Sequence, residues 1–270
     1  LLSGLNRPGE RHGTKYTYTA PGYRLKYKDM KDYRNETGRK LEILMEDKPT
    51  GLEVCSNIQF YDGISVIRSW TELKNNGEED LGVEYVSSFA LLGIDKEGLL
   101  STDEKLEVLI ARNAWQKELI WNRFSMDQLG MSISQPDKVR RSSQTISVGN
   151  TGNWSTKNYL PMGCLKNKET DSILFWQIEQ NGSWYWEISD QDGHMYLQLS
   201  GPTEHQSHWW KNLKPGDTFA SVPVSVGSAC GDVEEAAGEL TKYRRAIRRK
   251  NEDNEKLPVI FNDYMNCQIG

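Results

Sequence analysis

The sequence predicts a mainly β protein, in which a large antiparallel β-sandwich is followed by one helix and one further strand. Short runs with alternating apolar side chains recur between turn residues over residues 41–226, as is typical of an all-β sandwich. A helical period appears after Gly231, where apolar residues recur three and four positions apart. A continuous apolar run then occupies residues 257–261, as expected for a strand buried on both faces.

Residues 1–40 are rich in Gly, Tyr, Lys and Arg and show little periodicity. We interpret them as a long ordered loop with one short strand at residues 16–19. Loops of this length are uncommon in compact domains unless they have a function. Strand signals separated by turn residues follow this segment. Strands are expected at residues 41–46, 52–60, 64–73, 83–92, 106–112, 116–122 and 145–148.

Residues 172–200 carry the heaviest apolar pattern and are expected to form a three-stranded antiparallel meander. Asn181-Gly182 lies between the first two runs and predicts a tight hairpin, because a primed turn requires positive φ. Each run has one apolar face, which a second layer must cover. The apolar residues of these faces are Leu174, Trp176, Ile178, Trp184, Trp186, Ile188, Met195, Leu197 and Leu199. Loop structure is expected at residues 159–163, and a last sandwich strand at residues 218–226.

A helix is expected to begin at Asp232, because Asp232 and Glu235 have the spacing of a capping box. Acidic residues lie early in this segment and basic residues late, an order that complements the helix dipole. We interpret the basic run as a solvated helix end rather than an anion site, and residues 251–256 as a polar linker. The apolar stripe of the helix comprises Val233, Ala236, Ala237, Leu240, Tyr243 and Ile247.

Polar residues follow the apolar run 257–261, beginning with Asn262 and Asp263. A buried parallel strand with polar residues at its carboxyl end is how barrel and doubly wound enzymes begin. The expected division is therefore a sandwich domain over residues 1–230, a linker helix over 231–256, and the start of a barrel over 257–270. We interpret the sequence as the front part of a larger enzyme.

The composition excludes several classes of protein. Charged residues are 26% and hydrophobic residues 37% of the 270 residues, values typical of a globular protein that does not cross a membrane. The net charge of −5 argues against nucleic acid as a partner. The four cysteines form no C-x-x-C pair, and reduced thiols in a cytoplasmic protein are the expected reading.

No residue pattern in the sequence indicates a catalytic or metal centre. His205 and His208 lack further zinc ligands nearby, and Asp190-Gln191-Asp192-Gly193 is explained by a hairpin turn rather than a calcium loop. Two hypotheses follow from the residues alone. The first is a sandwich that binds carbohydrate through outward aromatics such as Phe175, Tyr185 and Tyr196, unless these side chains serve cross-strand packing. The second is a structural front domain that packs on a catalytic barrel.

A series of short segments occurs in an order that is more specific than any one of them. They are residues 21–24 (PGYR), 32–34 (DYR), 52–54 (LEV), 60–63 (FYDG), 68–70 (RSW), 85–89 (YVSSF), 141–143 (RSS), 201–204 (GPTE), 223–224 (PV) and 258–264 (PVIFNDY). In this order, and with the helix and strand at the end, the chain resembles the amino-terminal part of glycoside hydrolase family 36, the bacterial α-galactosidases. The resemblance covers essentially the whole chain.

The resemblance implies a β-supersandwich that precedes a (β/α)₈ barrel, and hydrolysis of terminal α-linked galactose from melibiose and raffinose-type oligosaccharides with retention of configuration. Retention requires two carboxyl groups about 5–5.5 Å apart. In the family both are Asp residues on later barrel strands, beyond Gly270, so no catalytic residue is expected here and this chain alone is expected to be inactive. The resemblance also implies a homo-oligomer, a tetramer, for the full-length protein.

Two groups of residues match parts of the family's substrate site. Asp263 and Tyr264 match the end of the first barrel strand, where many members have Trp in place of Tyr264 and use it to line the galactose site; capping of the strand is the alternative role. Asp32, Tyr33 and Arg34 match a loop that reaches a neighbouring subunit's active site in tetrameric members; packing within the chain is the alternative. Oxocarbenium chemistry with paired carboxylates needs neither a metal nor a cofactor, and none is implied.

Overall fold

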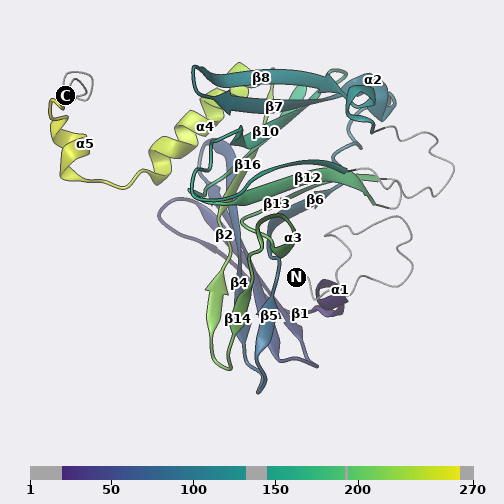
Figure 1. Cartoon of the computed structure of the whole chain (residues 1–270), viewed down its shortest axis with the longest axis vertical. Helices are drawn as coiled ribbons and strands as arrows, with labels where there is room; N and C mark the ends of the chain where they lie inside the picture. The colour runs from purple at the N-terminus through teal and green to yellow at the C-terminus, as the bar shows by residue number, and fades with distance from the viewer. Residues whose placement is uncertain (1–19, 132–144, 192–193, 262–270) are drawn as a thin grey trace, which may run out of the picture.

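The computed structural model of the chain describes residues 20–131, 145–191 and 194–261 (Figure 1). All strand pairs among these residues are antiparallel. The predicted mainly antiparallel β fold class is therefore confirmed. The strand expected at residues 16–19 lies outside the described residues, as do most of the loop between β8 and β9 and the residues after Phe261.

One large sheet spans the molecule and contains ten strands. Nine follow one another by hydrogen bonding, and β15 (Thr218–Ala220) adds to β4 alongside β16. In order across the sheet, the nine are β1 (Lys26–Arg34), β2 (Arg39–Asp47), β3 (Leu52–Tyr61), β4 (Ile64–Asn75), β16 (Val224–Cys230), β11 (Ser172–Ile178), β10 (Tyr159–Asn167), β7 (Leu106–Ala114) and β8 (Lys117–Ser125).

Smaller elements complete the architecture. A four-stranded sheet has the order β6 (Ser87–Leu92), β13 (His194–Ser200), β12 (Trp184–Gln191) and β9 (Thr145–Asn150). A two-stranded ribbon joins β14 (Lys211–Leu213) to β5 (Leu81–Val83). The helices are α1 (Ala20–Arg24), α2 (Thr102–Lys105), α3 (Glu204–Ser207), α4 (Val233–Ile247), α5 (Glu252–Lys256) and the 3₁₀ turn η2 (Asp127–Leu129).

The four-stranded sheet packs face to face on one half of the large sheet. Trp176 of β11 and Trp186 of β12 meet edge to face at the centre of this interface, with ring centroids 5.1 Å apart and an interplanar angle of 76°. Both side chains are fully buried. Edge-to-face contact is a favoured arrangement of aromatic rings, and burial of these two indoles contributes strongly to the sandwich core.

The expected meander over residues 172–200 is correct in its strands and in the pairing of the second with the third, but wrong in the pairing of the first with the second. The strands β11, β12 and β13 form at the predicted positions, yet β11 pairs with β10 and β16 in the large sheet, whereas β12 pairs with β9 and β13 in the other. A tight hairpin at Asn181-Gly182 would require positive φ, and neither residue has it. The segment between β11 and β12 therefore carries the chain from one sheet to the other.

Three further expectations are corrected by the strand boundaries. Residues 159–163, expected as a loop, open β10, where the register with β7 shifts between Tyr159 and Gly163. Pro161 lies within this irregular stretch; it lacks a backbone N–H and disturbs the strand pattern. Residues 83–92, expected as one strand, divide between β5, which pairs with β14, and β6, which pairs with β13. Residues 218–226, also expected as one strand, divide between β15, which pairs with β4 alone, and β16, which pairs with β4 and β11.

The long loop expected over residues 1–40 is also wrong for its described part. Residues 20–24 form α1, and β1 then forms the edge of the large sheet. All nine residues of β1 are exposed, so neither face demands apolar side chains and the strand lacks amphipathic alternation. A bulge between Tyr27 and Asp29 further breaks the two-residue period.

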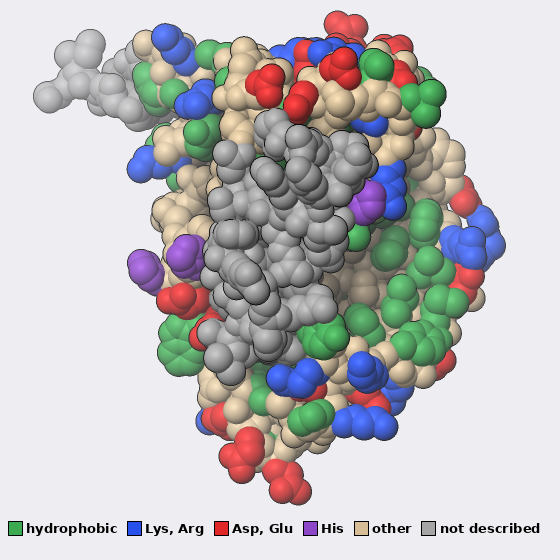
Figure 2. Space-filling model, turned by 90° about the vertical axis from the view of Figure 1, so that its right-hand side faces the viewer, with side chains coloured by type: hydrophobic (Ala, Val, Ile, Leu, Met, Phe, Trp, Pro, Cys, Tyr) green, Lys and Arg blue, Asp and Glu red, His purple; other side chains and the backbone are tan. Residues whose placement is uncertain are grey.

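The inner face of β2 and β3 is only partly covered beyond the edge of the four-stranded sheet. Met45, Val54 and Ile58 line a hollow of about 280 Å³ together with Phe89 of β6. Figure 2, a view from the side, shows hydrophobic side chains around a hollow on this face of the molecule. The described chain therefore leaves apolar surface of the large sheet accessible at this point.

Helix α4 covers the outer face of the large sheet (Figure 1). The predicted capping box at its start is present, with Asp232 as N-cap and the Glu235 carboxylate accepting a bond from the Asp232 backbone N–H. The buried residues of α4 are Ala236, Leu240 and Tyr243, as the helical period predicts. They pack on Phe175 and its apolar neighbours in the sheet, so the large sheet is apolar on both faces here.

The segment after α4 differs from the sequence-based prediction. The polar linker expected over residues 251–256 contains the short helix α5, which Asn251 caps by accepting a bond from the Asn254 backbone. Residues 257–261 form no strand with any described residue, and Val259 and Phe261 are 99% and 80% exposed. A strand buried on both faces needs neighbours on both sides, which the described residues do not supply. Among the described helices, none is long and apolar enough to cross a membrane.

Candidate functional site

The three site residues near the amino terminus lie at the turn end of the β1–β2 hairpin. Asp32 accepts bonds from Nε and Nη2 of Arg39, the first at 2.7 Å, and Arg34 forms an ion pair with Asp62. The Arg39 guanidinium lowers the pKa of Asp32, chiefly through these hydrogen bonds. Asp32 is therefore ionised at neutral pH, and both pairs are exposed enough to exchange partners with an approaching molecule.

Tyr33 belongs to a different cluster on the opposite face of the sheet edge, because successive strand residues point to opposite faces. Its hydroxyl donates to Oε1 of Glu42 at 2.8 Å, and Nζ of Lys40 donates to the same oxygen at 2.7 Å. Lys40 also lies 5.0 Å from the centroid of the Trp70 ring, a cation–π distance. Hydrogen bonds from Lys40 and Tyr33 lower the pKa of Glu42.

Consequently the Asp32-Tyr33-Arg34 triplet does not converge on one point. Asp32 and Arg34 present a charged patch on one face, whereas Tyr33 belongs to a mixed aromatic and charged patch on the other. Each side chain has an intrachain partner, as the packing alternative expects, and each remains partly exposed. Carboxylate, guanidinium and phenol groups arranged in this way can hydrogen-bond to hydroxyl-rich or charged partners.

Among the other residues singled out from the sequence, those that the structure describes form no metal centre. Asp263 and Tyr264 lie outside the described residues. Within the described ranges, no group of three His, Cys, Asp or Glu side chains could hold a metal ion. His205 lies in α3, and His208 forms the left-handed C-cap of that helix, with φ of 53°.

The proposed aromatic sugar platform is overturned by burial. Phe175, Tyr185 and Tyr196 are 0%, 7% and 1% exposed. Phe175 lies under α4, and the hydroxyls of Tyr185 and Tyr196 each donate to a different oxygen of Glu187 at 2.8 Å. These rings therefore cannot stack on a sugar. The apolar stripe of α4 was the sequence signal for the burial of Phe175, since that stripe requires an apolar partner face.

Glu179 is a structurally important residue that sequence reasoning missed. Its Oε2 accepts bonds from Nε and Nη2 of Arg68 on β4 at 3.0 and 2.7 Å, and its Oε1 accepts from the hydroxyl of Tyr243 on α4. Burial raises the pKa of Tyr243, and the bond to Glu179 raises it further. The Tyr243 ring also meets Tyr61 edge to face at 5.2 Å. This cluster fixes α4 on the sheet.

Two packed sheets of unequal size, with a helix on the outer face of the larger one, define a β-supersandwich. No family model and no curated protein sequence matches the chain. Among solved structures, the fold is shared with α-galactosidases of glycoside hydrolase family 36, at identities low enough that the likeness concerns the fold alone.

The particular neighbours are bacterial enzymes. AgaB from Geobacillus stearothermophilus matches with a TM-score of 0.71 and 17% identity over 89% of this chain and 32% of its own. A variant of AgaA from the same organism, in complex with stachyose, matches with a TM-score of 0.70 and 17% identity over 86% of this chain and 32% of its own. The α-galactosidase from Lactobacillus brevis matches with a TM-score of 0.66 and 14% identity, over 82% of this chain and 29% of its own. The chain thus spans about a third of the length of these proteins.

Proposed function

We propose that this chain is the amino-terminal, non-catalytic part of a retaining α-galactosidase that removes terminal α-galactosyl residues from melibiose and raffinose-type oligosaccharides. The match of nearly the whole chain to about a third of AgaB carries this proposal. Solved structures of AgaA in complex with stachyose and with raffinose support the substrate class. Each of those ligands is named for AgaA, and its transfer to this chain is part of the proposal.

The chemistry of the described carboxylates fits a supporting role. Retaining hydrolysis needs two carboxyl groups about 5–5.5 Å apart on either side of a sugar. Glu187 is 3% exposed and held by two tyrosines, so a sugar cannot reach it. Asp32 and Glu42 are neutralised by basic partners on the surface. The reacting pair is assigned to a barrel that follows residue 270.

On this proposal the chain divides into three parts. Residues 1–230 form the supersandwich, residues 231–256 the linker, and residues 257–270 the start of the barrel, which would cover the exposed apolar run 257–261. The sandwich supports the barrel and the assembly of a cytoplasmic homo-oligomer. Asp263 and Tyr264 would border the galactose site of their own barrel, and Asp32, Tyr33 and Arg34 would reach toward that of a neighbouring subunit.

The sequence that follows Gly270 in the complete protein tests this proposal. It should contain the remaining strand–helix units of a (β/α)₈ barrel, with an Asp at the carboxyl end of two of the strands. A continuation without such units, or with barrel strands that lack the two Asp residues, would contradict the assignment.

A further inference from the structure

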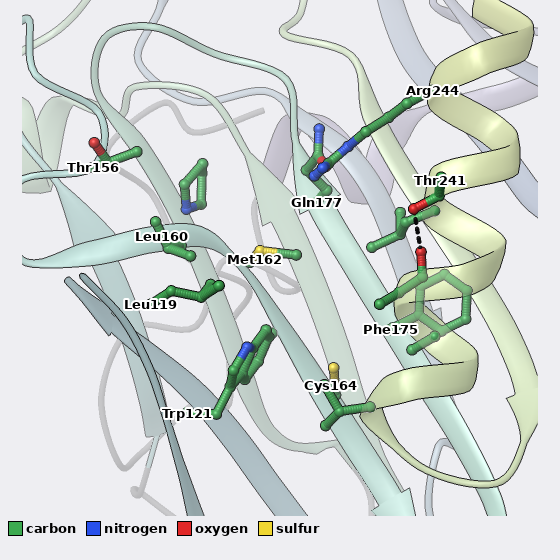
Figure 3. A pocket seen from close by; sticks show the side chains of 16 residues that line it. Leu119, Trp121, Thr156, Leu160, Met162, Cys164, Phe175, Gln177, Thr241 and Arg244 are labelled. Atoms are coloured by element: carbon green, nitrogen blue, oxygen red, sulfur yellow. Dashed lines mark hydrogen bonds between the residues drawn. The ribbon is translucent and has the colours of Figure 1, made fainter. Parts of the chain in front are cut away.

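A groove of about 400 Å³ runs between α4 and the outer face of the large sheet (Figure 3). Leu160, Met162 and Phe175 from β10 and β11 form its floor, and Leu119 and Trp121 of β8 form the wall opposite α4. The helix contributes small side chains, among them Ala236 and Ala237. Such a groove can accept a ridge of apolar side chains, because small residues let a partner approach the helix backbone closely.

Polar groups in the groove are few, and described residues already satisfy several of them. The Thr241 hydroxyl donates to the Ala237 carbonyl at 2.7 Å, the bond drawn in Figure 3. Burial raises the pKa of the Cys164 thiol to about 12, so this thiol is unreactive at neutral pH. A small-molecule site would place polar groups so that they fix the orientation of its ligand. The groove instead has the apolar character of a protein interface core.

One end of the groove is charged. Arg244 donates from Nε to the amide oxygen of Gln177 at 3.0 Å, and Nη2 donates to the same oxygen. Within the described residues, Arg244 has no carboxylate partner. Arg245 follows directly, and both lie on exposed positions of α4. A partner that fills the apolar part and carries a carboxylate opposite this end would complement the groove.

The backbone of the β7–β8 hairpin gives an independent sign of an interface. Leu119 has a φ of 55°, a left-handed conformation that is rare for a bulky residue. Its side chain lines the groove and is 59% exposed, and Trp115 at the tip of the same hairpin is 82% exposed. A strained residue that presents an apolar side chain to solvent is expected where a contact compensates for the strain.

The course of the chain indicates which partner this is. Helix α4 borders the groove and leads through α5 into the exposed apolar run 257–261 (Figure 1). Proteins that share the fold are about three times as long as this chain. Any polypeptide that continues the chain is therefore tethered to the helix that borders the groove, which raises its effective concentration there. A separate partner would have no such advantage.

We propose that the α4 groove is the docking surface for the polypeptide that follows residue 270, which inserts an apolar ridge between α4 and β8 and places a carboxylate near Arg244. This inference rests on the proposed function, since it requires a chain longer than the one described. It adds the location and the chemistry of the contact between the sandwich and the rest of the protein.

Two substitutions on α4 test the proposal in the complete protein. Ala237→Glu places a charge in the groove, whereas Ala246→Glu makes the same chemical change on an exposed part of α4 that does not line it. We expect Ala237→Glu to lower the unfolding temperature of the complete protein by at least about 3 °C more than Ala246→Glu does. In residues 1–270 alone, the two variants should differ by less than this.

Hydrogen exchange supplies a second readout that does not depend on a variant folding. Peptides from α4, β8 and β10 should exchange more slowly in the complete protein than in residues 1–270. Equal effects of the two variants in the complete protein, together with unchanged exchange, would overturn the inference. Exchange could instead be slow in residues 1–270 alone, and only at concentrations where a dimer forms. That result would also overturn the inference, because it would show that a second copy of the chain occupies the groove.

The result is separable from that of the proposed function. A complete protein with α-galactosidase activity but an unprotected groove would contradict only the docking site. A complete protein without activity whose groove is protected would contradict only the enzyme assignment.

Discussion

Arg68 on β4 donates two hydrogen bonds to a single carboxylate oxygen of Glu179, at 3.0 and 2.7 Å. The remaining oxygen of that carboxylate accepts the hydroxyl of Tyr243. Glu179 follows β11 and opens the segment that crosses between the two sheets. One residue thus ties together a central strand, the crossing segment and the helix through which the chain leaves the sandwich.

Replacing Glu179 by Gln should destabilise the protein by about 1–2 kcal/mol. Hydrogen bonds to charged groups contribute about 1.5–3 kcal/mol, and the lower value is expected because solvent screens Arg68, whose side chain is one-third exposed. Urea unfolding measures the difference. Glu252→Gln is the matched control, because its ion pair with Lys256 is largely exposed and should contribute less than about 0.5 kcal/mol. Equal losses for the two variants would show that Glu179 does not hold α4.

The contact between Trp176 and Trp186 tests the packing of one sheet on the other. In the observed sandwich the two indoles touch across the interface, and a double-mutant cycle with Phe or Leu at each position should give a coupling energy of about 0.5–1.5 kcal/mol. A coupling energy near zero would contradict the observed face-to-face contact.

Acid should weaken the attachment of α1 to β2. Asp47 accepts bonds from Arg24 at 3.0 and 2.8 Å, and these bonds lower the pKa of Asp47 below its unfolded value. Its contribution is therefore complete above about pH 4 and is lost as the pH falls through the folded pKa. Asp47→Asn should lower the free energy of unfolding by about 1–2 kcal/mol at pH 7. The loss stays in this range because solvent screens Arg24, whose side chain is 43% exposed. As the pH falls from 4 to 2.5, the free energy of unfolding should decrease less in Asp47→Asn than in the unsubstituted protein. Urea unfolding at several pH values measures this difference. An equal decrease in both proteins would contradict the role of Asp47.

The exposed pair Asp32–Arg39 separates a role in the site from a role in stability. Asp32→Asn should leave the unfolding free energy essentially unchanged, because exposed ion pairs contribute little to stability. If Asp32 contacts substrate in a neighbouring subunit, kcat/KM of the complete protein for raffinose should fall about 5-fold or more, which corresponds to one lost hydrogen bond. Glu53→Gln, on β3 of the same sheet, serves as the control. An unchanged kcat/KM would leave Asp32 with the intrachain role alone.

Periodicity predicted most strands correctly, because side-chain alternation is a local property of a half-buried strand. It could not predict β1, whose residues are exposed on both faces. It also missed β10, where Pro161 and a register shift interrupt the pattern. Periodicity also could not predict which strands pair with β11. A two-residue period shows which face of a strand is buried, but not which sheet contains the strand.

The candidate site was predictable only in part. The Asp32-Tyr33-Arg34 triplet lies on the surface. Its division between two faces follows from the alternation of side chains along β1, and the prediction of a loop there could not show it. The burial of Phe175 follows from the position of α4, a contact between residues far apart in the chain. Glu179 gave no sequence signal, because its neighbours Arg68 and Tyr243 come together only in the folded protein.

Hydrolysis of 4-nitrophenyl α-D-galactopyranoside by the complete protein, compared with residues 1–270, is the most direct test of the assignment. We predict turnover with retention of configuration by the complete protein and none by residues 1–270, because the paired carboxylates are assigned to the part that follows. Absence of α-galactosidase activity in a folded complete protein, or activity in residues 1–270 alone, would contradict the account.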